Sequence, residues 1–398
     1  MRPLSPTCSL DDPLRSAQDP FAIQGGRMLT PEGWRETDLV ISEGCLRPGI
    51  PAGSVPTLDA RGLWVLPGLI DLHGDAFERV YCPRPGVRFP LEMALQEHDR
   101  LLLANGITTF FFSIADSFEP GIRGRESARR LVEAVKSSAR RLRVNGYVHL
   151  RHEESQVNGL DELVGWMESR RIDLLSFNDH LPDPDDRAQV ARFLKSLRLR
   201  EHLSEDDAYR MIREAVAQRE QGRSQCDELA RRARTLGIPT ASHDDDLERL
   251  RQSVRRGVRL IEFPMNGATA LRAKKEGLAV LMGAPNVVHG RSHLGWLSVR
   301  EAVRSGSVDL LCSDYHYPSL MAAPFILAKD GLCSFETAWR MVSAVPAQQV
   351  GLAHRKGEIK DGYDADLVLL DPAANGSTPI RGVIVGGRIA ALFPDVSR

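Results

Sequence analysis

The stretch GLIDLHGDAFER, residues 68–79, joins an apolar run to a polar turn. His73 and Asp75 lie two residues apart where the apolar run ends. Side chains alternate across a strand, so residues i and i+2 point to the same side. The imidazole and the carboxylate are therefore expected to converge on one point. Such a pair is a way to begin a metal site.

Seven more apolar segments follow, separated by amphipathic segments such as RRLVEAVKSSARRL. The expected strands are 67–75, 107–115, 145–153, 172–179, 238–245, 258–265, 278–284 and 308–314. Eight strands interleaved with helices predict a (β/α)8 TIM barrel over residues 67–345, with a doubly wound α/β sheet as the second choice.

Three other segments differ from this pattern. Residues 19–66 and 346–398 contain short apolar stretches punctuated by Gly and Pro, which predict a small β-sandwich domain formed by both termini. Residues 186–236 are too long for one barrel helix and predict a helical insertion, with a capping box beginning at Ser204. Residues 1–18 predict a flexible arm.

The composition limits the class of protein. The 398 residues are 42% hydrophobic, and 52 Lys and Arg stand against 53 Asp and Glu, so the chain has no overall attraction to nucleic acid or anionic membrane. The six cysteines are scattered, which argues against a disulfide framework. No run approaches the roughly 20 apolar residues of a membrane span. We therefore expect a cytoplasmic protein with no nucleic acid or membrane partner; a homo-oligomer remains open.

Metal-competent side chains recur at the ends of the expected strands. In a barrel the carboxyl ends of the strands line the active site. The residues at those ends are His73, Asp75, Glu153, His180, His243 and Asp314. Nitrogen and oxygen ligands suit Zn, Mn or Fe. Six ligands exceed what one catalytic ion usually takes from a protein, so the set predicts two divalent metal ions.

The other histidines lack this placement. His98, His202 and His354 lie in helical segments or in the tail and are expected at the surface. His149 and His152 share a strand with Glu153. By alternation His152 faces away from Glu153, which favours a packing or supporting role.

Several motifs together resemble a known family. They are LPGLIDLHGD, SHDDD, GAPNVV followed by GRSH, and LCSDYHYPS. This ordered set is similar to the amidohydrolase superfamily, which couples a metal-centred barrel to a small β-sandwich. More narrowly, PRPG at 83–86, ANGITT at 104–109 and FNDHLP at 177–182 resemble the ribose 1-methylphosphonate 5-triphosphate diphosphohydrolases of the carbon-phosphorus lyase pathway.

The resemblance implies roles for the strand-end residues. It implies His73 and Asp75 on the first metal, and Glu153 as a shared ligand in place of the modified lysine common in the superfamily. His180 and His243 would bind the second metal. Asp314 would touch the metal site and act as the catalytic residue that moves protons. The expected ligands fall on strands 1, 3, 4, 5 and 8, whereas the superfamily commonly uses 1, 4, 5, 6 and 8, so either the strand count or the ligand arrangement differs.

A phosphorylated small-molecule substrate would require cations in the pocket. The candidates are Arg84, Arg151, and the loop residues Arg291, Ser292 and His293. Arginine forks and backbone amides are groups that hold phosphate. In the diphosphohydrolases this loop reads approximately Gly-Gly-Ser-His-Ser-Gly-Asn, whereas here GRSHLGWLS introduces Leu294 and Trp296. The exact substrate therefore stays open.

Three hypotheses follow. The leading one is a metal-dependent hydrolase that cleaves a phosphoanhydride in a ribose phosphonate or nucleotide triphosphate and releases pyrophosphate. The second is a hydrolase of a C–N bond in a cyclic amide or amine. The third is a non-catalytic scaffold, which retention of all six metal-competent residues argues against.

Overall fold

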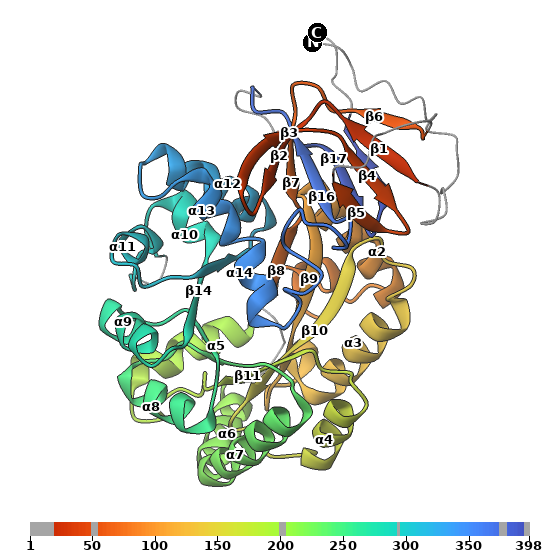
Figure 1. The fold of residues 1–398 in the computed structure, drawn as a ribbon. Coiled ribbons are helices and arrows are strands. Elements are labelled where there is room, and N and C mark those ends of the chain that lie inside the picture. The colour runs from red at the N-terminus through yellow and green to blue at the C-terminus, as the bar shows by residue number, and fades with distance from the viewer. Residues whose placement is uncertain (1–19, 49–54, 199–203, 293–294, 374–379, 394–398) are drawn as a thin grey trace.

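The computed structural model describes residues 20–48, 55–198, 204–292, 295–373 and 380–393 (Figure 1). A barrel of parallel strands carries smaller sheets at one end, and these sheets contain both red N-terminal and blue C-terminal strands (Figure 1). The expected arm, residues 1–18, lies outside the described residues.

The barrel contains eight parallel strands that pair in chain order, without the reversal of strand order that defines a doubly wound sheet. They are β8 Leu69–Gly74, β9 Ile107–Asp116, β10 Asn145–Glu153, β11 Leu174–Asn178, β12 Thr240–His243, β13 Leu260–Glu262, β14 Ala279–Gly283 and β15 Leu310–Cys312. Each overlaps one expected strand, although several are shorter than expected. The predicted (β/α)8 barrel is thus confirmed, the doubly wound alternative is wrong, and the strand count was correct.

The ring closes between β8 and β15, next to the opening sequence motif. Gly74 and Asp314 form an isolated parallel bridge. The Asp314 amide donates to the His73 carbonyl over 2.9 Å, and the Asp75 amide donates to the Asp314 carbonyl over 3.0 Å. The seam of the barrel therefore brings the first and last predicted site residues together.

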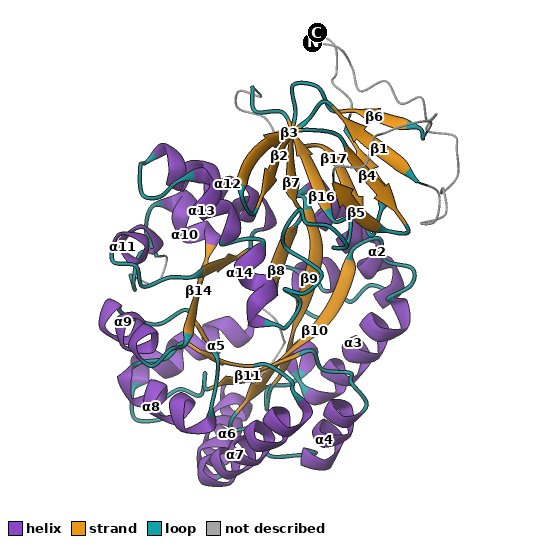
Figure 2. Ribbon diagram, viewed as in Figure 1, coloured by secondary structure: helices purple, strands orange, loops and turns teal. Residues whose placement is uncertain are grey.

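Helices cover the outside of the barrel strands, which explains why strands such as ITTFFFSIAD are apolar on both faces (Figure 2). The helices are α1 Phe77–Tyr81, α2 Leu91–Ala104, α3 Arg125–Ser138, α4 Leu160–Glu168, α5 Arg187–Arg198, α6 Glu205–Ala217, α7 Arg219–Leu236, α8 Leu247–Arg256, α9 Gly267–Lys275, α10 Ala284–His289, α11 Val299–Arg304, α12 Tyr317–Lys329, α13 Phe335–Arg340 and α14 Ala344–Gln349, with the 3-10 helix η1 Gly121–Arg123.

In the described part of the connection between β11 and β12 there are three helices, α5 to α7, where one would suffice. The side chain of Ser204 caps α6 by accepting a hydrogen bond from the Asp207 amide, as the capping pattern predicts. In α7, Gly222 packs against the segment after β10. A Cβ added to Gly222 would lie 1.7 Å from the Glu154 carbonyl oxygen, so only glycine allows this approach.

Two smaller sheets are formed by the chain ends, and the six-stranded one combines N-terminal with C-terminal strands. Their strands are β1 Phe21–Gln24, β2 Arg27–Thr30, β3 Gly33–Glu36, β4 Leu39–Ser42, β5 Cys45–Pro48, β6 Thr57–Asp59, β7 Trp64–Pro67, β16 Leu367–Leu370, β17 Ile380–Val385 and β18 Arg388–Leu392. One sheet has the order β5-β4-β1-β6 and the other β18-β17-β16-β7-β2-β3. Buried residues from both ends, such as Ile23 and Ile384, share one hydrophobic core. The expected use of both termini is confirmed.

One histidine assignment was wrong. His98 is fully buried and its ring lies within 5.2 Å of Phe77, Phe110, Phe112 and Tyr317. It follows Leu95 by three residues and precedes Leu102 by four, so it belongs to the inner stripe of α2. By contrast, His354 is exposed as expected, and His202 lies outside the described residues.

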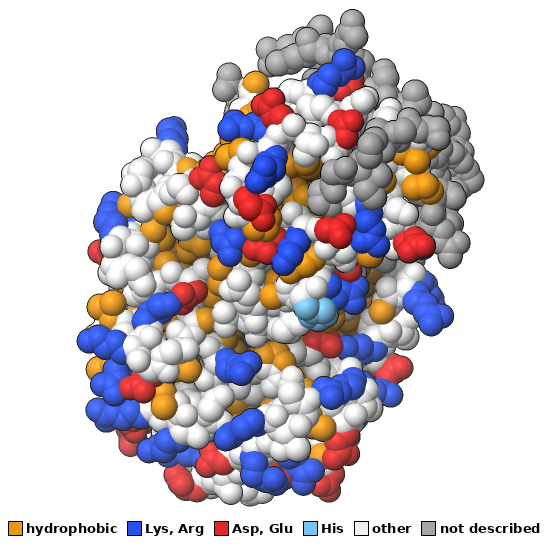
Figure 3. All heavy atoms as spheres, viewed as in Figure 1, with side chains coloured by type: hydrophobic (Ala, Val, Ile, Leu, Met, Phe, Trp, Pro, Cys, Tyr) orange, Lys and Arg blue, Asp and Glu red, His pale blue; other side chains and the backbone are white. Residues whose placement is uncertain are grey.

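The surface carries charges of both signs. Lys and Arg side chains intermingle with Asp and Glu over the face shown in Figure 3, in keeping with a formal net charge of −1. Among the described helices, none has the length and apolar character needed to cross a membrane.

The Gly222 contact predicts a large difference between two Gly→Ala changes. Gly222→Ala is expected to lower the free energy of unfolding by about 1–3 kcal/mol, because the methyl group would overlap backbone. Gly165→Ala in α4 meets open space and is expected to raise it by about 0.5–1 kcal/mol. Urea unfolding of both variants measures this, and equal effects would contradict the proposed contact.

His98 predicts a pH dependence of stability. Burial lowers its pKa in the folded state to about 3, so above pH 6.5 the buried neutral ring is at no disadvantage. As the pH falls below 6.5 the unfolded chain binds a proton that the folded state excludes, which costs about 2 kcal/mol at pH 5. Between pH 7.5 and 5 the unfolding free energy of the wild type should fall by about 2 kcal/mol more than that of His98→Phe, which lacks the buried imidazole. His354→Phe, which removes an exposed histidine, should follow the wild type.

Candidate functional site

The carboxyl ends of the barrel strands surround a cavity of about 200 Å³. Its lining includes seven residues expected from the sequence and aromatic residues that were not. The expected ones are His73, Asp75, Arg151, His243, Arg291, Ser292 and Asp314, and the aromatic ones are Phe263, Trp296 and Tyr315. The structure thus brings residues from six barrel strands or the loops after them to one rim.

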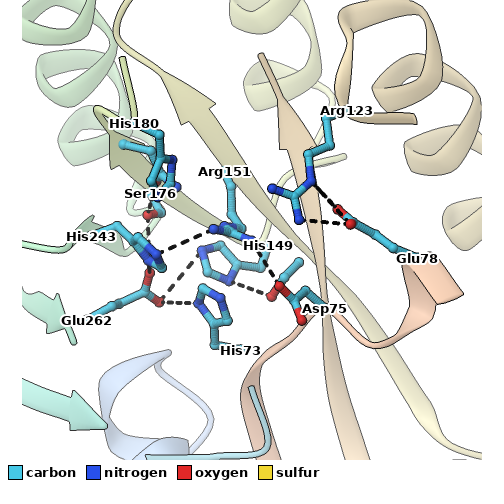
Figure 4. Close-up of polar contacts among 12 residues, drawn as sticks. His73, Asp75, Glu78, Arg123, His149, Arg151, Ser176, His180, His243 and Glu262 are labelled. Carbon is cyan, nitrogen blue, oxygen red and sulfur yellow. Dashed lines mark hydrogen bonds and ion pairs between the residues drawn. The ribbon is translucent and has the colours of Figure 1, made fainter. Parts of the chain in front are cut away.

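A first cluster of possible cation ligands contains His73, His149 and Glu262. All three are buried, and they come from β8, β10 and β13. The Glu262 Oε1 atom lies 3.2 Å from His73 Nδ1 and 3.8 Å from His149 Nε2 (Figure 4). These three side chains point toward one another in the wall of the barrel.

This cluster fits a cation because its inward atoms lack hydrogen-bond partners. His73 Nδ1, His149 Nε2 and Glu262 Oε1 are all buried without one. His149 Nδ1 is held instead by the Leu72 carbonyl at 3.0 Å, which turns Nε2 toward Glu262. Burial, together with Arg151, lowers the pKa of His73 to about 3, so its ring is neutral and can offer a lone pair.

A second cluster adjoins the first and contains His180, His243 and Asp244. The Asp244 carboxylate lies 3.5 Å from His180 Nε2 and 3.7 Å from His243 Nε2. Glu262 links the two clusters, because its second oxygen, Oε2, lies 3.2 Å from His243 Nδ1 (Figure 4). One carboxylate therefore faces both groups of possible ligands.

Glu153 lies against His180 rather than between the clusters. Its Oε1 makes a very short contact with His180 Nδ1, and its Oε2 accepts from the His180 amide at 3.0 Å. Burial opposes charge on His180, but Glu153 and Asp244 outweigh it and raise the pKa of His180 to about 10. In this arrangement Glu262, not Glu153, has the position of a shared ligand.

Sequence reasoning missed three residues of these clusters. Glu262 ends its strand as the expected ligands do, and that signal was available. His149 lies in phase with Arg151 and Glu153, at every second position of one strand. Asp244 follows His243 directly, where alternation would send it to the other face. It is brought inward by a left-handed backbone with a φ of 54–55°, a conformation shared by Asp314.

Asp314 lies close to the other carboxylates of the cavity. Burial and then Asp75 raise its pKa well above the ordinary range. Gly283 leaves room for it, since a Cβ there would lie 3.0 Å from Asp314 Oδ2. A carboxyl group of raised pKa in the cavity wall takes up a proton more readily than an ordinary carboxylate.

The predicted substrate-binding residues are divided by the structure. Arg151 is buried and lines the cavity, as do Arg291 and Ser292. Arg84 lies on an exposed turn and is not among the lining residues of the described cavity. His293 lies outside the described residues.

Comparisons with known proteins identify the family of the chain. A model of the amidohydrolase family matches residues 189–390. The alpha-D-ribose 1-methylphosphonate 5-triphosphate diphosphatase of Escherichia coli (strain K12) is 32% identical over 320 residues, which cover 78% of this chain and 84% of that protein. The chain belongs to the amidohydrolase family. It is accordingly a hydrolase, and the scaffold hypothesis is set aside.

Solved structures of distant sequence share the amidohydrolase fold. The ochratoxinase of A. niger matches with a TM-score of 0.61 and 13% identity, covering 93% of this chain and 95% of that one. The dihydropyrimidinase of Brevibacillus agri NCHU1002 matches with a TM-score of 0.54 and 14% identity, covering 92% and 94%. Likeness at this level of identity shows the fold alone.

The position of Glu262 predicts its effect on cation binding. Glu262→Gln keeps the shape of the side chain but removes the charge that faces both clusters. We expect the divalent cation to bind to Glu262→Gln at least about tenfold more weakly than to the wild type, a loss of about 1.4 kcal/mol of binding free energy. Metal content after dialysis, measured by mass spectrometry, tests this. The exposed Glu97→Gln on α2 is the control, and wild-type retention by Glu262→Gln would refute a shared-ligand role.

Proposed function

We propose that this amidohydrolase is a metal-dependent hydrolase that cleaves a phosphoanhydride bond in a ribose phosphonate or nucleotide triphosphate and releases pyrophosphate. The observation that carries the proposal is a buried guanidinium, Arg151, in a cavity beside two clusters of cation ligands. The identity to the Escherichia coli diphosphatase over most of both chains supports the same assignment.

The residues present suit divalent cations. His73, His149 and Glu262 would hold one, and His243, Asp244 and His180, once His180 has lost its proton, a second. Imidazole and carboxylate ligands are compatible with Zn, Mn or Fe. When bound, such ions supply an activated water and polarise the oxygens of the group under attack.

The side chains of the chain itself would bind and orient the substrate. Arg151 can donate to phosphoryl oxygens, because its Nε and Nη1 atoms are buried without hydrogen-bond partners. Arg291 and Ser292 in the wall offer further donors for a charged tail. Trp296 also lines the cavity, where its ring would limit water and pack against a pentose.

Asp314 would hold the proton of the reaction. It lies in the cavity wall, and its backbone amide and carbonyl are fixed by the barrel seam. A carboxylate so placed would accept a proton from the attacking water and return it to the leaving phosphate oxygen. The fixed backbone limits the loss of orientation that this transfer would otherwise require.

A product assay distinguishes this proposal from cleavage of a C–N bond. We expect manganese- or zinc-loaded protein to release pyrophosphate from at least one sugar or nucleoside 5-triphosphate, detected by phosphorus NMR. Asp314→Asn is expected to lower the rate about 100-fold or more. The exposed Asp206→Asn serves as control. Release of ammonia or a carboxylate from cyclic amides, with no pyrophosphate from any triphosphate, would instead establish the C–N alternative.

A further inference from the structure

The two clusters of possible ligands differ in what their atoms contact. In the first, three buried atoms lack hydrogen-bond partners: His73 Nδ1, His149 Nε2 and Glu262 Oε1. In the second, His180 Nδ1 contacts Glu153, and His243 Nε2 lies 3.4 Å from a guanidinium nitrogen of Arg151. The first cluster is therefore open to a cation, whereas the second already contacts a cationic side chain.

The hydrogen bond from Arg151 decides the tautomer of His243. A guanidinium has only donors, so His243 Nε2 must accept in this contact. The proton of the neutral ring is then on Nδ1, where it can be donated to Glu262 Oε2 at 3.2 Å. The lone pair of Nε2, the atom beside Asp244, is thus used by Arg151.

Arg151 is held in this position from two sides. Its side chain is 7% exposed and projects from β10 into the centre of the site (Figure 4). Its Nη1 lies 3.5 Å from the Asp75 carboxylate, opposite the contact with His243. A guanidinium stays protonated at all ordinary pH values, so this positive charge cannot be removed by deprotonation.

From these contacts we infer that Arg151 competes for His243 with the cation of the second cluster. The two ions therefore bind with unequal affinity, because Arg151 weakens the binding of the ion at the second cluster. One lone pair cannot serve a hydrogen-bond donor and a cation together. In addition, two positive charges a few ångströms apart repel strongly in a buried site. The inference rests on the proposed metal centre and adds to it an order of binding: the cluster of His73, His149 and Glu262 fills first.

The competition predicts a gain of binding when an arginine is removed. Titration of the full-length, metal-stripped protein with Mn²⁺, followed by equilibrium dialysis and electron paramagnetic resonance, counts the ions and detects a spin-coupled pair. We expect the wild type to bind one ion tightly and a second at least about tenfold more weakly. In Arg151→Gln the second affinity should rise about tenfold or more, and the spin-coupled signal should appear at lower Mn²⁺.

Two controls separate charge competition from structural damage. Arg151→Lys keeps a cation at this position and should keep the wild-type difference between the two affinities. Arg123→Gln removes another arginine near Asp75. Arg123 pairs with Glu78 through two nitrogens and not with the second cluster (Figure 4). This variant should also bind the two ions as the wild type does. A misfolded variant would lose ions rather than gain one.

Two outcomes would overturn the inference. One is a wild type that binds two ions with equal affinity, which needs no variant to establish. The other is an Arg151→Gln protein that folds but whose second affinity is unchanged or lower. Pyrophosphate release by the same wild-type preparation tests the proposed function separately, because an active enzyme with two equal ions would refute only the competition.

Discussion

The buried carboxylate of Glu262 is the constraint on which the centre of this barrel depends. It is fully buried and faces imidazoles from three other strands, but Oε1 has no hydrogen-bond donor. An ionised carboxylate in such a place costs several kcal/mol unless a positive charge compensates it. Burial keeps His73 and His149 neutral, so these rings do not supply that charge. Arg151 supplies one positive charge nearby, and a bound cation would compensate the Glu262 carboxylate further.

Backbone hydrogen bonds and backbone conformation position the side chains on the rim around Glu262. The seam between β8 and β15 fixes Asp314 through its own amide and carbonyl. Asp244, Phe263 and Asp314 each follow a barrel strand in the left-handed conformation, which non-glycine residues seldom adopt. At Asp244 and Phe263 this turn directs into the cavity a side chain that alternation would send outward, whereas Asp314 is already in phase with the inward residues Leu310 and Cys312. Phe263 then lies edge-on to both His73 and His243, at 5.0 and 5.1 Å between ring centres.

One strand, β10, supplies three of the ionisable side chains of the site. Its inward residues are His149, Arg151 and Glu153, which supply a ligand of the first cluster, the central guanidinium and the partner of His180. The neighbouring insertion supports the end of this strand, since Gly222 of α7 lies directly on the Glu154 carbonyl. Arg256 of α8 also binds both Glu154 and Asp227 of α7. The insertion is thus joined to the strand that positions the site.

The sequence by itself determined the eight strands, their order and the residues at their ends. Apolar runs of strand length between amphipathic helices allow few arrangements, and the carboxyl ends of a parallel barrel must share one rim. The motifs at His73, His243 and Asp314 were therefore enough to indicate both the family and the place of the site. The spacing of His98 in the sequence also places it on the apolar face of its helix, but histidine is a polar residue type and was therefore expected at the surface.

Only the tertiary structure decided how those side chains are grouped. Strand ends place residues on a rim but do not say which pairs lie within contact distance around it. Glu262 rather than Glu153 faces both clusters because of the barrel's circular order, in which β13 lies next to β12 and across from β8 and β10. Asp244 turns inward through a backbone angle that alternation does not predict. Arg151 reaches His243 across the interior, and a contact between residues 92 positions apart depends on closure of the ring.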